Sequence, residues 1–320
     1  MTFEFPELSG NVSSSRNNRT FVEPLSNASG ETPNIGPNMK LAQFSENGVT
    51  GLGIVVSDGL VDLRKRLPPQ VNSMIDLIEH WSALSGVLQA MARFRPDLSM
   101  ERVTLKAPIS RPGKIMCIGL NYADHAAETK MELPADQLWF TKAVTSIADP
   151  YGTVELPKVS SSLDYEVELV FVIGKRCRHV TRAQAPEVIF GYCIGNDISV
   201  RDWQFKTSQF TLGKSFDTHA PIGPWIVTAD AFDPHRAGIA CFVNGEERQR
   251  SNTRQFVFDC YAMVEHLSKA MTLEPGDIVF TGTPAGVGIG HKPPRWLKAG
   301  DVVRSEIDGI GAIQNRVAPE

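Results

Sequence analysis

The sequence predicts a mostly β fold, a roll or barrel with peripheral helices, preceded by a small N-terminal α+β domain. Short apolar runs alternate with turn residues from about residue 106, and two hairpin signals occur, Asn244-Gly245 and Asp308-Gly309. No regular βα rhythm and no G-x-G-x-x-G after a strand is found, which argues against a Rossmann sheet. Helical patterns are few here, at about 122–130, 182–189 and 259–271.

The first 105 residues divide into a tail and a small accessory domain. Residues 1–38 are rich in Ser, Asn, Gly and Pro without periodicity, which predicts a disordered or loosely docked tail. This tail is either dispensable or a strap across a dimer. Residues 39–105 hold no cluster of reactive side chains. They predict strands at 39–45, 51–57 and 60–63 and one helix over 73–94, with Ser73 as its N-cap.

The composition excludes several functional classes. The chain has 320 residues, 42% of them hydrophobic, and a formal net charge of −4, so it lacks the basic surface that nucleic acids or anionic membranes attract. We find neither an 18-residue apolar run nor a signal-peptide pattern at the N-terminus. The five cysteines form no C-x-x-C pair, which predicts reduced, mostly buried thiols in a cytoplasmic protein.

The stretch "SLDYEVELVFVIG" (162–174) places two carboxylates in an apolar strand. Because side chains alternate between the two faces of a strand, Glu166 and Glu168 share one face. Both faces are apolar beyond the glutamates, so the strand is expected to be buried, where like charges repel strongly. Arg or Lys partners, a shared proton or a metal cation would each neutralise the pair.

A third carboxylate follows about thirty residues later, in "YCIGNDISVRDWQ". Asp197 ends an apolar strand, where its side chain can enter a cavity. Together with Glu166 and Glu168 it would offer three carboxylate oxygens to a hard divalent cation such as Mg²⁺, Mn²⁺ or Ca²⁺. A salt-bridged pair served by a nearby arginine remains the alternative from spacing alone.

The segment "CIGLNYADHAAET" follows a strand predicted at 114–119. His125 and Glu128 are three residues apart in a helical turn and share one face. A carboxylate beside an imidazole fixes its tautomer and raises its basicity, as in a general-base pair. The alternative is an exposed histidine that neighbours a glutamate by chance.

Two further elements can contribute charge and hydrogen-bond donors. In "TLGKSFDTHAPIGPW", a short loop could direct the Lys214 ammonium inward to stabilise developing negative charge. In "VFTGTPAGVG", a Gly- and Thr-rich loop follows a strand, and its N–H groups with the hydroxyls of Thr281 and Thr283 suit a carboxylate or phosphate. The loop lacks the lysine and the spacing of a P-loop.

Together these pieces resemble the fumarylacetoacetate hydrolase family, over about residues 111–317. The resemblance is carried by the order of the motifs "GLNYADHAAE", "FTK", "DYEVELVFVIGK", "GNDISVRDWQ", "LGKSFDT", "VNGEERQRSNT", "GDIVFTGTPAGVG" and "KPPRWLKAGDVV". It implies a mixed β-sandwich roll for a catalytic domain spanning 106–320. It also implies a metal, Mg²⁺, Mn²⁺ or possibly Ca²⁺, held by Glu166, Glu168 and Asp197.

The resemblance also implies residue roles and an activity. His125 and Glu128 match the catalytic pair and Lys214 the active-site lysine. The positions that bind or polarise substrate are Tyr122, Lys142, Arg201, Gln204 and Thr283. The implied reaction is metal-dependent hydrolysis of a C–C bond in a 2,4-dioxo acid by a cytoplasmic homodimer, giving a pyruvate and a carboxylic acid. Decarboxylation of an oxaloacetate-like acid, and hydration or isomerisation of an enol acid, are the alternatives, with a non-enzymatic metal-stabilised scaffold as the last.

Overall fold

Strand β11 (Val167–Ile173) lies inside the largest sheet of the computed structural model, which describes residues 39–124 and 134–320. All seven of its residues are buried. Its alternate side chains enter two different apolar cores. Val167, Leu169, Phe171 and Ile173 belong to one core, and Val170 and Val172 belong to the other. This two-faced burial confirms the period-two reading of the sequence.

The largest sheet combines strands from both parts of the described chain. Its strands follow the order β4-β3-β2-β1-β14-β12-β11-β17-β6-β7, with β5 paired to β1 and β8 paired to β14. The members beyond residue 106 are β6 (Ile115–Gly119), β7 (Leu138–Thr141), β8 (Ile147–Ala148), β12 (Ile189–Asn196), β14 (Ala220–Thr228) and β17 (Ile278–Phe280). Strand β11 is therefore paired on both edges, with β12 and β17.

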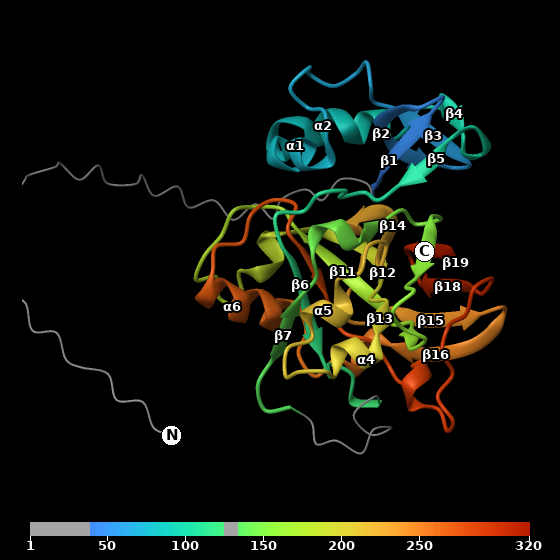
Figure 1. The fold of residues 1–320 in the computed structure, drawn as a ribbon. Helices are drawn as coiled ribbons and strands as arrows, with labels where there is room; N and C mark the ends of the chain where they lie inside the picture. The colour runs from blue at the N-terminus through green and yellow to red at the C-terminus, as the bar shows by residue number, and fades with distance from the viewer. Residues whose placement is uncertain (1–38, 125–133) are drawn as a thin grey trace, which may run out of the picture. The chain divides into compact units, whose positions relative to one another are not determined.

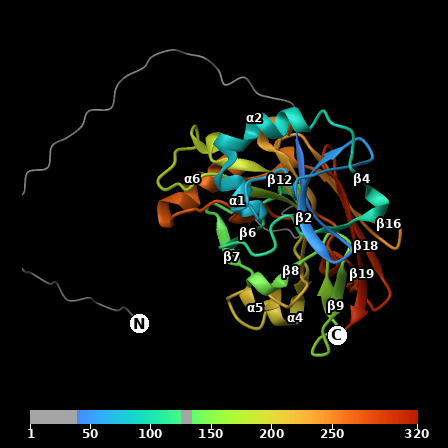
Figure 2. The same ribbon diagram turned by 90° about the horizontal axis from the view of Figure 1, so that it is seen from above.

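A second sheet of five strands packs against one face of the first. Its strands are β9 (Thr153–Leu156), β15 (Gly238–Val243), β16 (Glu246–Asn252), β18 (Val302–Ile307) and β19 (Gly311–Pro319). The hairpins β15–β16 and β18–β19 turn at the predicted Asn-Gly and Asp-Gly pairs. Ile239, Val303 and Ile313 of this sheet share the core of Leu169. In both views β16, β18 and β19 lie to one side of β12 (Figures 1 and 2). The two packed sheets confirm the predicted mostly β sandwich.

Residues 39–106 form strands and two helices. The strands are β1 (Lys40–Glu46), β2 (Val49–Val56), β3 (Gly59–Asp62), β4 (Leu98–Ser99) and β5 (Thr104–Lys106). Strand β1 pairs with β14, so this part extends the large sheet. The core that contains Val170 also contains Leu41 and Leu77, so one apolar cluster joins both parts. The domain boundary near residue 106 stays a prediction.

The single helix predicted over 73–94 is wrong in one respect. The structure has two helices, α1 (Met74–Glu79) and α2 (Trp81–Met91), which meet at His80. The His80 ring nitrogen Nδ1 lies 2.8 Å from the Asp76 carbonyl oxygen, so a side chain competes for a backbone acceptor at the break. Ser73 is the N-cap, as predicted, and forms a capping box with Asp76.

The helix predicted at 182–189 is also wrong. Only a 3₁₀ turn, η3 (Ala185–Glu187), is present, with Pro186 near its start, and β12 begins at Ile189. The predicted helix at 259–271 is confirmed as α6 (Cys260–Ala270), capped by the Asp259 side chain. Of the helix predicted at 122–130, Ala123 and Asp124 are helical and residues 125–130 lie outside the described part.

Three short elements place polar side chains near the start of β11. They are α4 (Arg201–Gln204), α5 (Thr211–Lys214) and the strand pair β10 (Leu163–Asp164) with β13 (Ser199–Val200). Helices α4 and α5 lie side by side in both views (Figures 1 and 2). The five cysteines are free thiols, as predicted, and Cys177 is the one that is only partly buried. Among the described helices, none has the length and apolar character to cross a membrane.

Candidate metal centre and active site

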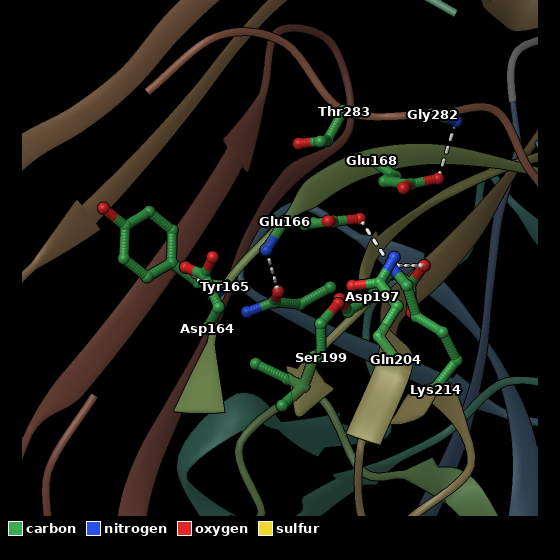
Figure 3. Close-up of polar contacts among 12 residues, drawn as sticks. Asp164, Tyr165, Glu166, Glu168, Asp197, Ser199, Gln204, Lys214, Gly282 and Thr283 are labelled. Carbon is green, nitrogen blue, oxygen red and sulfur yellow. Dashed lines mark hydrogen bonds and ion pairs between the residues drawn. The ribbon is translucent and has the colours of Figure 1, made fainter. Parts of the chain in front are cut away.

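Three buried carboxylates meet where β11 begins and β12 ends. Glu166 directly precedes β11, Glu168 is its second residue, and Asp197 directly follows β12. The antiparallel pairing of Val167 with Asn196 brings these positions together, and the Asp197 N–H donates to the Glu166 carbonyl at 2.9 Å. One oxygen from each carboxylate lies within 4.8 Å of the others (Figure 3). The three carboxylates predicted to form a cluster therefore do lie close together in the structure.

Two lysines neutralise part of this cluster. The Lys214 Nζ donates to Glu166 Oε2 at 2.9 Å and to Asp197 Oδ2 at 2.8 Å. The Lys142 Nζ donates to Asp197 Oδ1 at 2.5 Å and to the Ile198 carbonyl. Burial alone would lower the pKa of Lys214, but Asp197 and Glu166 outweigh it and hold that pKa above its usual value. Lys214 is therefore an ammonium in the folded protein.

An arginine neutralises the other side of Glu166. Arg201 Nη1 lies 2.6 Å from Glu166 Oε1, and its Nε donates to Asp164 at 2.8 Å. Burial would raise the pKa of Glu166, but Lys214 and Arg201 outweigh it and lower this pKa to about 2. Gln204 accepts a hydrogen bond from the same guanidinium at 2.9 Å. Glu166 is therefore ionised at any ordinary pH.

Glu168 has a different environment from its two neighbours. The backbone N–H of Gly282 donates to its Oε2 at 2.7 Å, and no cationic side chain pairs with it among the described residues. Burial, and then the charges of Asp197 and Glu166, raise its pKa well above the usual value. A proton or a bound cation must compensate this carboxylate. Three carboxylates around one point are the donor set of a hard divalent cation, so the residues fit a metal cofactor.

Glu166 and Glu168 are thus compensated in different ways. Arginine and lysine partners serve Glu166, and this alternative was open in the sequence. Glu168 keeps the need for a proton or a metal. Of the predicted metal ligands, all three lie together.

The loop that follows β17 holds Glu168 through a glycine. Gly282 adopts φ +89°, a left-handed conformation that glycine adopts readily, and a Cβ there would lie 2.8 Å from the Asn121 Cβ. Asn121 fixes this region by donating to the carbonyls of Thr281 and Phe258. Sequence reasoning gave no role to Asn121, because both residues that it contacts are more than 130 residues away along the chain.

The hydroxyls of this loop donate to the backbone of β11, so neither has a hydrogen left for a carboxylate or phosphate, and the substrate-binding role of Thr283 stays a prediction. Thr281 and Thr283 donate to the carbonyls of Leu169 and Val167, both in β11, at 2.8 and 2.9 Å. The carboxylate that this loop binds, through the N–H of Gly282, is that of Glu168 in the same chain. The hydroxyls are committed to β11 because the loop continues along its edge after β17 ends.

The remaining predicted residues fall into three groups. Lys214 was predicted to lie in a short loop, but it is the last residue of helix α5. Its ammonium points into the carboxylate cluster, as predicted. Tyr122 is fully buried, and its hydroxyl has no hydrogen-bond partner within the described residues. Burial and the Glu168 charge raise its pKa, so it is a neutral phenol. His125 and Glu128 lie outside the described residues.

One functional neighbour was missed by the sequence reasoning. Asp164 accepts hydrogen bonds from Arg201 and from the N–H groups of Gly288 and Ile289, at 2.8, 2.7 and 3.0 Å. It thereby ties a C-terminal loop to the base of the metal cluster. Its position two residues before Glu166 was the available signal. The adjacent Tyr165 points away from the carboxylates (Figure 3) and donates to the Gly286 carbonyl.

A cavity of about 840 Å³ has Tyr165 in its lining. Its lining includes Arg248, Trp296 and Lys298, but none of the three carboxylates. Size therefore does not identify the reactive centre in this protein. The convergence of buried charges at β11 identifies it.

A sandwich of two sheets with a buried carboxylate centre and an ammonium beside it defines a metal-site enzyme. The profile described as Fumarylacetoacetate (FAA) hydrolase C-terminal matches residues 114–318. The chain belongs to the fumarylacetoacetate hydrolase family. The resemblance drawn from the motifs is confirmed, and so is the fold.

Similar proteins differ in their named reactions. A Xenopus laevis protein, mitochondrial oxaloacetate tautomerase fahd2, is 43% identical over 87% of this chain and 90% of its own length. A fumarylacetoacetate hydrolase from psychrophilic Exiguobacterium antarcticum superposes with a TM-score of 0.75 at 37% identity, over 88% of this chain and all of its own. A Sphingobium sp. SYK-6 maleylpyruvate hydrolase, crystallised with manganese(II) and pyruvate, has a TM-score of 0.74 at 34% identity, over 88% and 99%.

Proposed function

We propose that this enzyme catalyses the enol–keto tautomerisation of oxaloacetate, or of a close 2-oxo dicarboxylic acid, with Mg²⁺ or Mn²⁺ as cofactor. The observation that carries the proposal is the 43% identity to the Xenopus oxaloacetate tautomerase over 90% of that protein. The two hydrolases of similar fold are less similar in sequence, at 37% and 34% identity. The three carboxylates and two lysines around one point suit an acid that develops charge on its 2-oxo oxygen.

The chain's own residues would divide the work of this reaction. Glu166, Glu168 and Asp197 would hold the cation. When bound, a divalent cation supplies Lewis-acid polarisation of the 2-oxo oxygen. The Lys214 ammonium uses two of its three N–H groups in the described contacts, so the third can donate to an oxygen that gains negative charge. Lys142 likewise uses two.

Tautomerisation also moves a proton between the enol oxygen and C3. His125, oriented by Glu128, is the predicted acid–base group, and both are sequence predictions outside the described residues. Tyr122 offers a neutral phenol whose hydroxyl is free within the described residues. It is suited to hydrogen-bond a substrate oxygen and not to remove a proton.

Hydrolysis of a C–C bond in a 2,4-dioxo acid is the second candidate. The manganese- and pyruvate-bound maleylpyruvate hydrolase favours it, because its structure is similar over 88% of this chain. In that reaction His125 would take a proton from water and the hydroxide would attack C4. The C3–C4 bond would then break to leave a carboxylic acid and the enolate of pyruvate, and a proton returned to C3 would give pyruvate. Decarboxylation of oxaloacetate would need no attacking water.

The test compares these reactions in one preparation. Purified protein with Mg²⁺ or Mn²⁺ is given enol-oxaloacetate, and the loss of the enol absorbance is followed. Parallel samples receive a panel of acylpyruvates, and pyruvate release is measured from both substrates. We expect accelerated enol loss without pyruvate release from oxaloacetate. Pyruvate from acylpyruvates with no effect on the enol would replace the tautomerase proposal by the hydrolase.

The variant Glu168→Gln should lose more than about a hundredfold of the main activity. Loss of an outer-shell partner alone typically costs 10–100-fold, and this change removes an anionic ligand. The measurement is the initial rate at saturating Mn²⁺, with Mn²⁺ binding recorded on the same sample. Full activity in this variant, or in EDTA-treated wild type, would contradict a metal-dependent reaction.

A further inference from the structure

The motif "VNGEERQRSNT" contains a buried residue to which the proposed reaction assigns no role. Gln249 lies in β16 with 1% of its surface exposed. We propose that Gln249 is a positioning residue of the metal centre: its carboxamide fixes the backbone unit between the two glutamate ligands and sets the hydrogen-bond direction of Thr283. The inference rests on the metal site of the proposed function, but its test does not need turnover.

Val167 is the backbone unit that separates the two glutamates. Strand β17 pairs with β11 only at residues 170–172, so β11 extends beyond it towards its start. The Val167 N–H and C=O would have no partner on this edge. Gln249 Oε1 accepts from the Val167 N–H at 3.1 Å, and the Thr283 hydroxyl donates to the Val167 carbonyl at 2.9 Å. Two side chains thus replace the missing strand.

The direction of every hydrogen bond in this group is determined by chemistry. A backbone N–H can only donate, so the Gln249 oxygen must face Val167. Its amide nitrogen then donates to Thr283 Oγ1 at 2.8 Å and to the Pro284 carbonyl at 2.9 Å. Because the Thr283 hydrogen goes to a carbonyl, the threonine oxygen has one lone pair left. Thr283 can therefore only accept a hydrogen bond from a ligand, such as an enol hydroxyl.

Few side chains can replace Gln249 at this place. Glutamate keeps the acceptor for Val167, but as a carboxylate it has no N–H for Thr283 or Pro284. Leucine has a similar volume and leaves the Val167 N–H, a buried donor, unpaired. Leucine removes the acceptor for the Val167 N–H, whereas glutamate keeps this acceptor and loses the bonds that anchor its own side chain to Thr283 and Pro284. Both changes therefore weaken the support that fixes the spacing of the two carboxylates.

The experiment measures Mn²⁺ affinity by calorimetry on the full chain, for wild type, Gln249→Leu and Gln249→Glu. Partners of metal ligands typically change affinity 10–100-fold, so we expect binding at least tenfold weaker in both variants. The matched control is Asn315→Ala. Asn315 is an equally buried carboxamide that donates to the Asp149 and Gly152 carbonyls and contacts no predicted ligand. This variant should melt at a lower temperature and bind Mn²⁺ like wild type.

Each outcome decides the question. Affinity within twofold of wild type in a folded Gln249→Leu variant overturns the proposal. If that variant does not fold, Gln249→Glu decides by the same criterion, and failure of both to fold overturns it in favour of a general structural role. Weak Mn²⁺ binding in the variants, with no tautomerase or hydrolase activity in wild type, would support Gln249 while refuting the proposed function.

Discussion

Two charged clusters in this molecule have similar contact distances but differ in how far their cationic side chains are exposed to water. In the N-terminal part, Arg64 Nη2 lies 2.7 Å from both Glu46 and Asp62, and Arg102 reaches Glu46 at 2.8 Å. The Arg102 side chain is 63% exposed. At the start of β11, Lys214 has comparable distances to two carboxylates, but its side chain is only 2% exposed.

The difference teaches what each cluster does. Water solvates the Arg102 guanidinium whether or not it pairs with Glu46, so this pair adds little stability. The buried charges have no water, so each must be compensated by its neighbours, and a well-packed apolar cluster would be at least as stable. The stability of the fold therefore does not explain the buried cluster, whereas the proposed binding of a cation and a charged substrate would.

The largest effect on stability should come from removing the buried ammonium of Lys214. Lys214→Met leaves Glu166 and Asp197 short of positive charge, and breaking a buried pair typically costs about 3–5 kcal/mol. Urea unfolding of the metal-free protein measures this loss. The matched control is Lys106→Met, because Lys106 pairs with Asp149 at 2.8 Å with both side chains about one third exposed. Equal losses in the two variants would remove the distinction between the clusters.

A buried group without a counter-ion should give the next largest effect. His219 donates from Nε2 to the Glu155 carbonyl at 2.8 Å, and its Nδ1 has no partner within the described residues. Burial, together with Lys142, lowers its pKa to about 4, although Asp217 acts in the opposite direction. The protonated ring is therefore disfavoured in the folded state.

The sign of the pH dependence follows from this lowered pKa. Between pH 6.5 and 4 the unfolded chain binds a proton at this histidine and the folded chain does not. Stability from His219 is thus fully present above pH 6.5 and is lost as the pH falls towards 4, by about 3 kcal/mol in total. His219→Gln keeps a donor for Glu155 and does not titrate. The difference in unfolding free energy between wild type and this variant should therefore change by about that amount, and a constant difference would contradict it.

The smallest effect belongs to the exposed cluster. Arg102→Ala should change the unfolding free energy by at most about 1 kcal/mol, because the Arg102 side chain is mostly exposed and its partner Glu46 keeps Arg64. Salt should reduce the effect further. Urea unfolding at low and high ionic strength checks this. A loss comparable to that of Lys214→Met would show that exposure does not separate the two clusters.

The centre of the fold could be predicted because its signal is local. The alternation along β11 and the E-x-E spacing place Glu166 and Glu168 on one side from sequence alone. Turn chemistry likewise gave both hairpins. The helix break at His80 could not be predicted from periodicity, because the apolar pattern that includes Leu77, Ile78, Trp81 and Leu84 continues across it.

The partners of the site residues were harder to predict. Lys142 and Asp197 are 55 residues apart, and nothing local connects them. Gln249 meets Val167 only because β16 passes the start of β11. The sequence and its family resemblance thus gave the ligands and named Lys142, Arg201 and Lys214 as site residues, and the tertiary structure showed which carboxylates each of them compensates. The homodimer and the cytoplasmic location stay predictions.

The two-faced burial of β11 has a consequence for how this enzyme can be divided. Val170 and Val172 share one apolar core with residues such as Leu41, Ile54 and Leu77. A gene fragment that starts at residue 106 would encode every described site residue and yet leave that face without its cover. Such a fragment should aggregate through this exposed apolar face and be degraded rapidly in a cell. The two segments must therefore be produced as one chain, although the described site residues lie in only one of them.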